Sequence, residues 1–253
     1  MKKRFMTVAM LLGLAAATWG MSDDVWKSKP YTEWTDADIQ KVIAMSPWVK
    51  TASVEATWKP VQQVNAASGQ MTNSGGGMST AGGGKQSGGT STILPAEAER
   101  DAGTKGPQVA FNVYWMSSQT MRAALARRSV LHNGKDPAEA QKYVEAPMDD
   151  YEIMVQGADM APFYRQEEKY YETNAALEIK KTKQKVMPSR VVYGKDPNGN
   201  INSAMFFFPK KVNGQDWLST SDKNVEFTCK LGVSTLHAVF EPAKMENQKG
   251  PDL

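Results

Sequence analysis

The chain has 253 residues and a formal net charge of +3, from 30 Lys and Arg against 27 Asp and Glu. Three of the basic residues and none of the acidic ones fall within residues 1–20, so the remainder carries 27 of each and is formally neutral. A neutral chain has no net field that would attract nucleic acid, which is therefore not expected as a partner. The single cysteine, Cys229, also excludes an intramolecular disulfide.

The N-terminus has the layout of a secretory signal peptide. Lys2, Lys3 and Arg4 precede an apolar run from Phe5 to Ala17, and small residues follow. This run is shorter than the roughly 20 residues that a membrane-spanning helix needs. We therefore expect residues 1–20 to be removed on export, which leaves residues 21–253 in the periplasm or outside the cell without a membrane span.

A helix is predicted to begin at Thr35. This residue is a suitable N-cap, and Asp38 stands where the acid of a capping box belongs. Trp34 and Ile39 are placed to form a hydrophobic staple across the cap. The pair Ser46-Pro47 should end the helix, because proline disfavours helical backbone in the residue before it.

Alternation of apolar and polar residues from Trp48 to Trp58 predicts a strand next. The tryptophans of this N-terminal segment leave two interpretations open. Trp34 and Trp48 either dock the segment on the core or form an exposed strip that binds a partner.

Residues 66–106 differ in composition from the rest of the chain. Glycines cluster there among Ser, Thr, Gln and Asn, with little apolar surface to offset the entropy of ordering. We therefore predict a disordered, low-complexity insertion within one domain. A phosphate-binding loop is not expected, because Gly84-Lys85 is followed by Gln86 rather than Ser or Thr.

The clearest strand-to-helix passage is residues 108–131. Period-two alternation predicts a strand over Gln108–Trp115, with Ser117 or Ser118 as the cap of a helix that ends near Gly134. Three arginines of this helix are interpreted as its solvated face or as a grip on an anionic partner. They are Arg122, Arg127 and Arg128.

Further elements follow by the same reasoning. They are helices at 137–144 and 165–174, strands at 151–155, 176–181, 225–231 and 235–240, and a hairpin that joins strands 190–193 and 201–208 through the turn at 196–200. Strands outnumber helices, so we predict an α+β fold with a mostly antiparallel sheet and a few short helices. Residues 21–253 should form a single domain around the insertion.

Few residues suggest catalysis. Cys229 falls on the apolar face of its strand, where a buried small hydrophobe is the simpler interpretation. The histidines, His132 and His237, lack partners at zinc-ligand spacing, so no metal site and no cofactor are expected. The alternative is a small secreted hydrolase that uses His237 with Ser234 or Cys229, although residues 232–236 lack the last glycine of the Gly-x-Ser-x-Gly signature.

The spacing Tyr31-x-x-Trp34-Thr35-x-x-Asp38, followed by Ser46-Pro47-Trp48, resembles the start of a family of uncharacterised exported proteins from acidobacteria. The similarity extends to residues 206–209, 225–227 and 245–253. It implies an exported protein and carries no known activity, so it transfers no functional residue. A further similarity links residues 34–43 with the tryptophan-bearing helix of GWxTD-domain proteins, whose Gly-Trp-x-Thr-Asp signature is itself absent.

These observations together predict an exported, non-catalytic binding or structural protein with a protein or envelope partner. The partner-binding candidates are Trp34, Trp48 and the three arginines. Nothing in the sequence indicates an oligomeric state.

Overall fold

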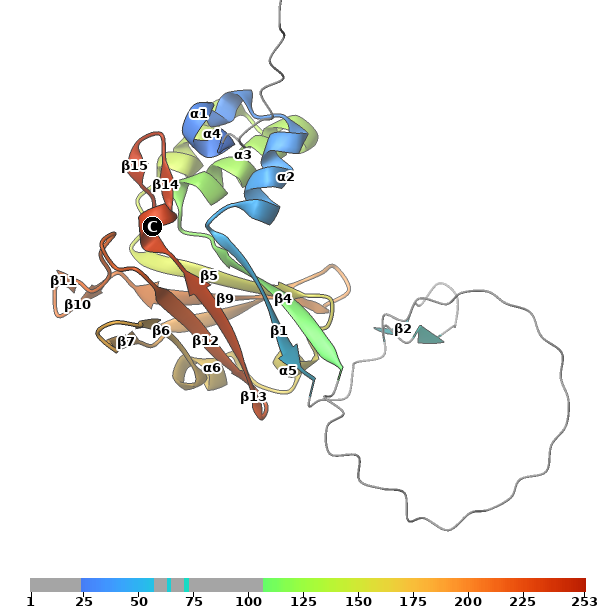
Figure 1. Ribbon diagram of the computed structural model, residues 1–253. Helices are drawn as coiled ribbons and strands as arrows, with labels where there is room; N and C mark the ends of the chain where they lie inside the picture. The colour runs from blue at the N-terminus through green and yellow to red at the C-terminus, as the bar shows by residue number, and fades with distance from the viewer. Residues whose placement is uncertain (1–23, 57–62, 65–70, 73–106) are drawn as a thin grey trace, which may run out of the picture.

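The computed structural model describes residues 24–56, 63–64, 71–72 and 107–253 (Figure 1). The predicted signal peptide, Trp58 and most of the predicted insertion at 66–106 lie outside these residues. The described part has an α+β fold with antiparallel sheets, as predicted. Helices α1 to α4 gather at one end of two facing sheets (Figure 1).

The N-terminal segment consists of α1 (Val25–Ser28), the 3-10 helix η1 (Tyr31–Glu33) and α2 (Asp36–Met45). The predicted capping box of α2 is present: Asp38 N donates to Thr35 Oγ1 at 3.3 Å, and Thr35 N donates to Asp38 Oδ2 at 2.9 Å. Trp34 and Ile39, the predicted staple pair, are both buried. The helix ends at Met45, directly before Ser46-Pro47 as predicted.

The larger sheet has five antiparallel strands in the order β1-β4-β5-β9-β8. Their bounds are β1 Val49–Glu55, β4 Gln108–Trp115, β5 Asp150–Gly157, β9 Ile201–Pro209 and β8 Arg190–Lys195. The predicted hairpin is confirmed as β8 and β9, which are joined around the turn at 196–200. Phe111, Ile153 and Phe206 are fully buried on one face of this sheet because alternate residues of a strand share a face.

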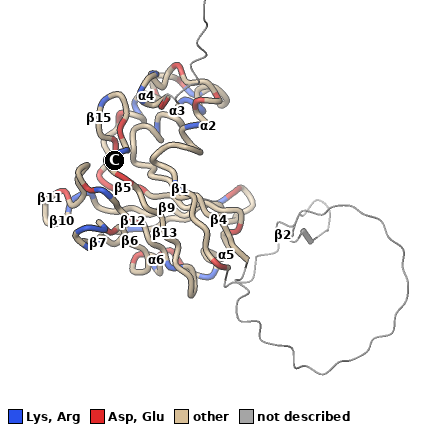
Figure 2. Tube along the Cα trace, in the orientation of Figure 1, with Lys and Arg blue, Asp and Glu red and all other residues tan. Residues whose placement is uncertain are grey.

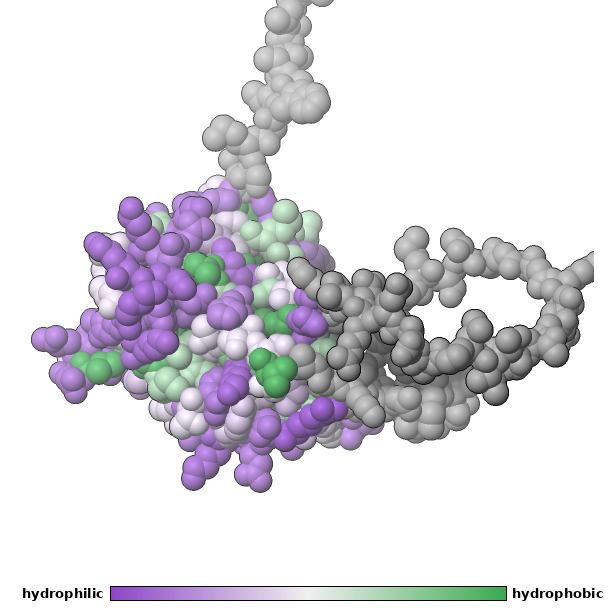
Figure 3. Space-filling view, turned by 60° about the horizontal axis from the view of Figure 1, so that its bottom comes forward, coloured by the Kyte–Doolittle hydropathy of each residue, from purple (hydrophilic) through white to green (hydrophobic). Residues whose placement is uncertain are grey.

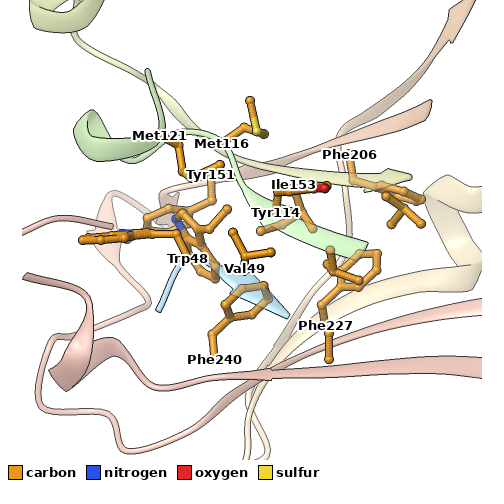
Figure 4. Packing of buried hydrophobic residues seen from close by; sticks show 14 of the residues in the cluster. Trp48, Val49, Tyr114, Met116, Met121, Tyr151, Ile153, Phe206, Phe227 and Phe240 are labelled. Carbon is orange, nitrogen blue, oxygen red and sulfur yellow. The ribbon is translucent and has the colours of Figure 1, made fainter. Parts of the chain in front are cut away.

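The smaller sheet has four antiparallel strands in the order β13-β12-β6-β7. Their bounds are β13 Ser234–Phe240, β12 Val225–Leu231, β6 Ala175–Ile179 and β7 Lys185–Val186. Aromatic side chains join the two sheets. The ring centroids of Phe206 and Phe227 lie 5.1 Å apart (Figure 4). Those of Trp115 and Phe240 lie 5.2 Å apart. One hydrophobic cluster therefore includes buried residues of both sheets and of the N-terminal segment.

Two longer helices complete the helical end, α3 (Gln119–Asn133) and α4 (Pro137–Glu145). Ser118 caps α3, since its Oγ accepts from Met121 N at 3.1 Å, and Gly134 ends it with a φ of 64°. Asp136 caps α4 as predicted. At the other end, α6 (Glu168–Asn174) begins three residues after its predicted start, and the single turn of α5 (Ala161–Tyr164) was not predicted.

The remaining elements are short. They are β2 (Gln63–Val64), β3 (Met71–Thr72), β10 (Lys211–Val212), β11 (Gln215–Asp216), the 3-10 helix η2 (Pro242–Lys244), β14 (Glu246–Asn247) and β15 (Gly250–Pro251). Basic and acidic residues are interspersed along the trace (Figure 2). Apolar side chains form only small separate spots on the face that Figure 3 shows outside the grey atoms. Among the helices in the described ranges, none has the length and apolarity needed to cross a membrane.

Candidate functional site

The sequence-predicted catalytic candidates lie on different faces of the smaller sheet. Cys229 points into the core and is fully buried, and burial raises the pKa of its thiol well above the usual value. His237 is exposed on the opposite face, because β12 and β13 pair Thr228 with His237 and Cys229 with Leu236. Ser234 is three residues from His237, and its Oγ donates to Glu55 O at 2.9 Å. The structure therefore does not bring His237 together with Ser234 or Cys229.

His237 belongs instead to an ion-pair cluster. Its Nδ1 lies 3.2 Å from Glu226 Oε1, and Lys180 Nζ lies 2.7 Å from Glu226 Oε2. Burial disfavours the charged form of Glu226, but the hydrogen bonds to Lys180 and His237 outweigh it and hold the pKa of this carboxyl below its usual value. Glu226 is thus a carboxylate with its charge already compensated on the outer surface of the sheet.

The tryptophan candidates are core residues, which corrects the interpretation of an exposed partner-binding strip. Trp34 is 3% exposed and Trp48 is fully buried. Both indole groups are hydrogen-bonded to backbone carbonyls: Trp34 Nε1 donates to Lys29 O at 2.9 Å, and Trp48 Nε1 donates to Asp252 O at 2.7 Å. Their role is to dock the N-terminal segment.

The interpretation of the three arginines as one solvated face is wrong for Arg122. Arg122 is only 7% exposed, and its Nη1 donates to Tyr143 O at 3.0 Å and to Ala146 O at 2.7 Å. It therefore satisfies carbonyl groups at the C-terminal end of α4. Arg127 Nε donates to Trp34 O at 3.0 Å, while Arg128 is exposed. The three side chains have three different environments and do not form a common anion-binding site.

A different site emerges at the helical end. A hollow of about 530 Å³ is lined by residues of α1, the end of α2, the start of β1 and η2. This volume falls within the range of roughly 300–1,000 Å³ that is usual for small-molecule sites. We call it the basic hollow because four lysines line it: Lys27, Lys41, Lys50 and Lys244.

Two acidic residues, Asp24 and Glu241, also line the basic hollow. Lys244 Nζ lies 2.7 Å from Glu241 Oε2, and this hydrogen bond is the main reason that the pKa of Glu241 is lowered, with Lys50 as a further contributor. Lys27 Nζ lies 4.0 Å from an Asp24 oxygen, at the limit of an ion pair. The lining thus contains four lysines and two carboxylates, and Lys27 Nζ also lies 4.0 Å from Glu246 Oε2, a carboxylate outside the lining.

Two buried polar groups in the lining have no hydrogen-bond partner within the described part of the chain. They are the indole Nε1 of Trp26 and the hydroxyl of Ser46, whose residues are 5% and 3% exposed. Buried polar groups in folded proteins are nearly always paired with protein or water, so an unpaired one requires an explanation.

Trp26 also lines a second, smaller hollow of about 80 Å³, which we call the aromatic hollow. Tyr31 and Trp34 line it as well, together with residues of α3, α4 and the β14–β15 hairpin. The ring of Trp26 packs edge-on against Trp48, with centroids 5.9 Å apart and planes at 85°. Trp26 therefore separates two cavities of different character, one charged and one apolar.

Sequence reasoning did not identify the basic hollow. Its lysines lie at four separate places in the chain, and Ser46 was recognised only as part of a helix stop. Across the described ranges, no group of three or more His, Cys, Asp and Glu side chains is arranged to hold a metal ion. Comparison of the chain with models of protein families, with curated proteins and with solved structures returns no match.

Proposed function

We propose that this protein is an exported, non-catalytic binding protein and that its helical end engages a partner in the cell envelope or outside the cell. The observation that carries the proposal is the basic hollow, a cavity of about 530 Å³ whose lining includes four lysines, two carboxylates and two side chains with a buried polar atom that has no hydrogen-bond partner in the described part of the chain. By contrast, the residues considered for hydrolysis are dispersed over two faces of a sheet. The geometry therefore favours binding over hydrolysis.

The export part of the proposal rests on the basic and apolar pattern of residues 2–17. N-terminal sequencing of the native protein from the periplasmic or extracellular fraction should give a start near residues 18–21. Recovery of intact Met1 from that fraction would contradict export with cleavage.

The binding part is tested by site-specific photo-crosslinking in the native envelope fraction. Met45 is 76% exposed and lines the basic hollow, whereas Val233 is 83% exposed in the β12–β13 turn at the opposite end of the molecule (Figure 1). A benzophenone amino acid in place of Met45 should give a discrete crosslinked species, and the same group in place of Val233 should not.

This pair of positions is a matched control, because both side chains are apolar and highly exposed. Identical crosslinking patterns at the two positions, or none at Met45, would refute the helical end as the binding end. Enzymatic activity that persists in the Ser234→Ala/His237→Ala double variant would refute the non-catalytic proposal. It would also refute the hydrolase alternative, which depends on these residues.

A further inference from the structure

We propose that Asn213 is a site of spontaneous chemical modification, at which the backbone nitrogen of Gly214 attacks the asparagine side chain and converts it to aspartate and isoaspartate. The two residues form the turn of the short hairpin of β10 and β11, and both are exposed. This modification is independent of the binding proposed above.

The reaction needs only the protein and water. The Gly214 nitrogen gives its proton to solvent and forms a bond to Cγ of Asn213, while the bond from Cγ to the side-chain nitrogen breaks and ammonia leaves. The cyclic imide that results is then hydrolysed. Water that adds at Cγ gives aspartate, and water that adds at the backbone carbonyl carbon gives isoaspartate. Glycine favours the first step, because it has no side chain to obstruct the approach.

Hydrogen bonding distinguishes this position from the other Asn-Gly pairs of the chain, which are residues 133–134 and 198–199. Gly134 N donates to Ser129 O at the end of α3. Gly199 N donates to Asp196 O at 2.9 Å. Gly214 N has no hydrogen-bond partner within the described part of the chain, so its attack breaks no such bond.

The stability of the surrounding structure also differs among the three pairs. Asn213 and Gly214 have φ values of 53° and 79°, the left-handed conformation of a type I′ turn. The closed turn fixes both residues, so the reaction proceeds from molecules in which the hairpin has opened. β10 and β11 pair at only two positions, and a two-stranded hairpin alone is marginally stable.

The other two pairs are held by larger elements. The turn at 196–200 joins β8 and β9 inside the five-stranded sheet, and Asn133 is the last residue of the 15-residue helix α3. Elements with few contacts open far more often than the core of a sheet or a long helix. The β10–β11 hairpin should therefore expose its Asn-Gly pair most often.

The products should disrupt this hairpin and leave the core intact. Aspartate and isoaspartate both add a negative charge, and isoaspartate also adds a carbon to the main chain, which does not fit a two-residue turn. The chain after the hairpin is fixed by Trp217, which is buried and whose Nε1 donates to Pro209 O at 2.8 Å. The damage is thus confined to the hairpin.

Peptide mass spectrometry of the mature protein, incubated at mildly alkaline pH, tests the proposal. Asn213 should be converted at least severalfold faster than Asn133 and Asn198 in the native protein, whereas the three should react at similar rates in urea. Native conversion of either other asparagine as fast as that of Asn213 would overturn the proposal. The same ranking in urea would overturn it as well, because the fold would then not be the cause.

A disulfide across the hairpin tests the opening step. Trp217 N donates to Lys210 O at 3.4 Å, so the next pair towards the turn, Lys211 and Asp216, is a non-hydrogen-bonded pair. The Cα atoms of such a pair are close enough for a disulfide. In the Lys211→Cys/Asp216→Cys variant, a disulfide between the two new cysteines would hold the hairpin closed.

The oxidised variant should convert Asn213 severalfold more slowly than the same variant after reduction. Asn198 is the matched control, and its rate should be the same in both forms. Cys229 is fully buried in the core and should not interfere. Equal rates at Asn213 in the oxidised and reduced forms would show that hairpin opening does not control the reaction and would reject the proposal.

Discussion

Trp48 and Asp252 are 204 residues apart in the chain, and Trp48 Nε1 donates a 2.7 Å hydrogen bond to the backbone carbonyl of Asp252. The carboxylate of the same aspartate accepts from Gln119 N at 2.6 Å and from Thr120 N at 2.8 Å, in the first turn of α3. One residue near the C-terminus thus joins the N-terminal segment to the central helix. An acid at a helix N-terminus is also favoured by the helix dipole.

The first prediction concerns this junction. Asp252→Ala leaves two backbone N–H groups at the start of α3 without their acceptor, so we expect the free energy of unfolding to fall by about 1–3 kcal/mol. Urea denaturation followed by circular dichroism measures the change. Asp216→Ala removes an exposed acid from β11 and should have no measurable effect. Equal stabilities of the two variants would show that Asp252 is not a structural cap.

The second prediction compares two contributions of Trp48 to stability, the packing of its buried ring and its hydrogen bond to Asp252. Trp48→Ala should cost about 3–5 kcal/mol, as is typical for a large aromatic removed from a packed core, out of a total stability of roughly 5–15 kcal/mol. Trp48→Phe keeps a buried aromatic ring and loses the hydrogen bond to Asp252 together with part of the ring volume, so it should cost clearly less. A thermal melt compares them. If both variants have the same melting temperature as the wild type, the N-terminal segment is not an integral part of the fold.

The third prediction concerns Arg122. Arg122→Met retains the aliphatic volume but leaves the carbonyls of Tyr143 and Ala146 unpaired at the end of α4. We expect a loss of about 1–3 kcal/mol, with α4 as the first element to exchange its amide hydrogens. Arg128→Met, on the exposed side of the same helix, is the control and should be neutral. A neutral Arg122→Met would assign this arginine no structural role.

Local signals explain why much of the secondary structure was predictable. The Thr35–Asp38 capping box, the Ser118 and Asp136 caps and the turn at 196–200 each depend on residues within four positions of one another. Each of these hydrogen bonds therefore has a signature that can be found in a short stretch of sequence. For the same reason α5 was missed, because a single turn has no periodicity to detect.

The candidate site was beyond sequence reasoning because its parts meet only through tertiary packing. Trp26 and Ser46 approach Lys244 only when η2 packs beside α1 and β1, about 200 residues away along the chain. The burial of Arg122 had the same origin. The sequence of α3 alone indicates a solvated position for Arg122. The two carbonyl groups that bind it belong to the end of α4 and the residue after it.

The fourth prediction concerns acid stability. The hydrogen bond from Lys29 Nζ, at 2.8 Å, is the main cause that lowers the pKa of Asp38 to about 2, and the backbone N–H of Thr35 contributes next. A carboxyl whose folded pKa lies below its ordinary value of 3.8 stabilises the fold at higher pH, and this contribution is lost as pH falls from about 4 towards 2. Asp38→Asn should therefore be less stable than the wild type at about pH 6 and equally stable near pH 2. Urea titrations at both pH values measure this difference, and a gap that persists unchanged at the lower pH would reject the linkage.

The last prediction concerns the thiol of Cys229, on which one form of the hydrolase alternative depends. Cys229 is fully buried on β12, its pKa is raised by burial, and His237 lies on the other face of the sheet. A thiol reacts through its thiolate, so both the protonated state and the lack of access protect it. We therefore expect no reaction with a disulfide reagent such as Ellman's reagent in the native protein, and one equivalent of thiol after denaturation. Cys229→Ala should lower stability through lost packing without any change in ligand binding, whereas rapid labelling of the native protein would place the thiol in an accessible, activated site and revive the nucleophile interpretation.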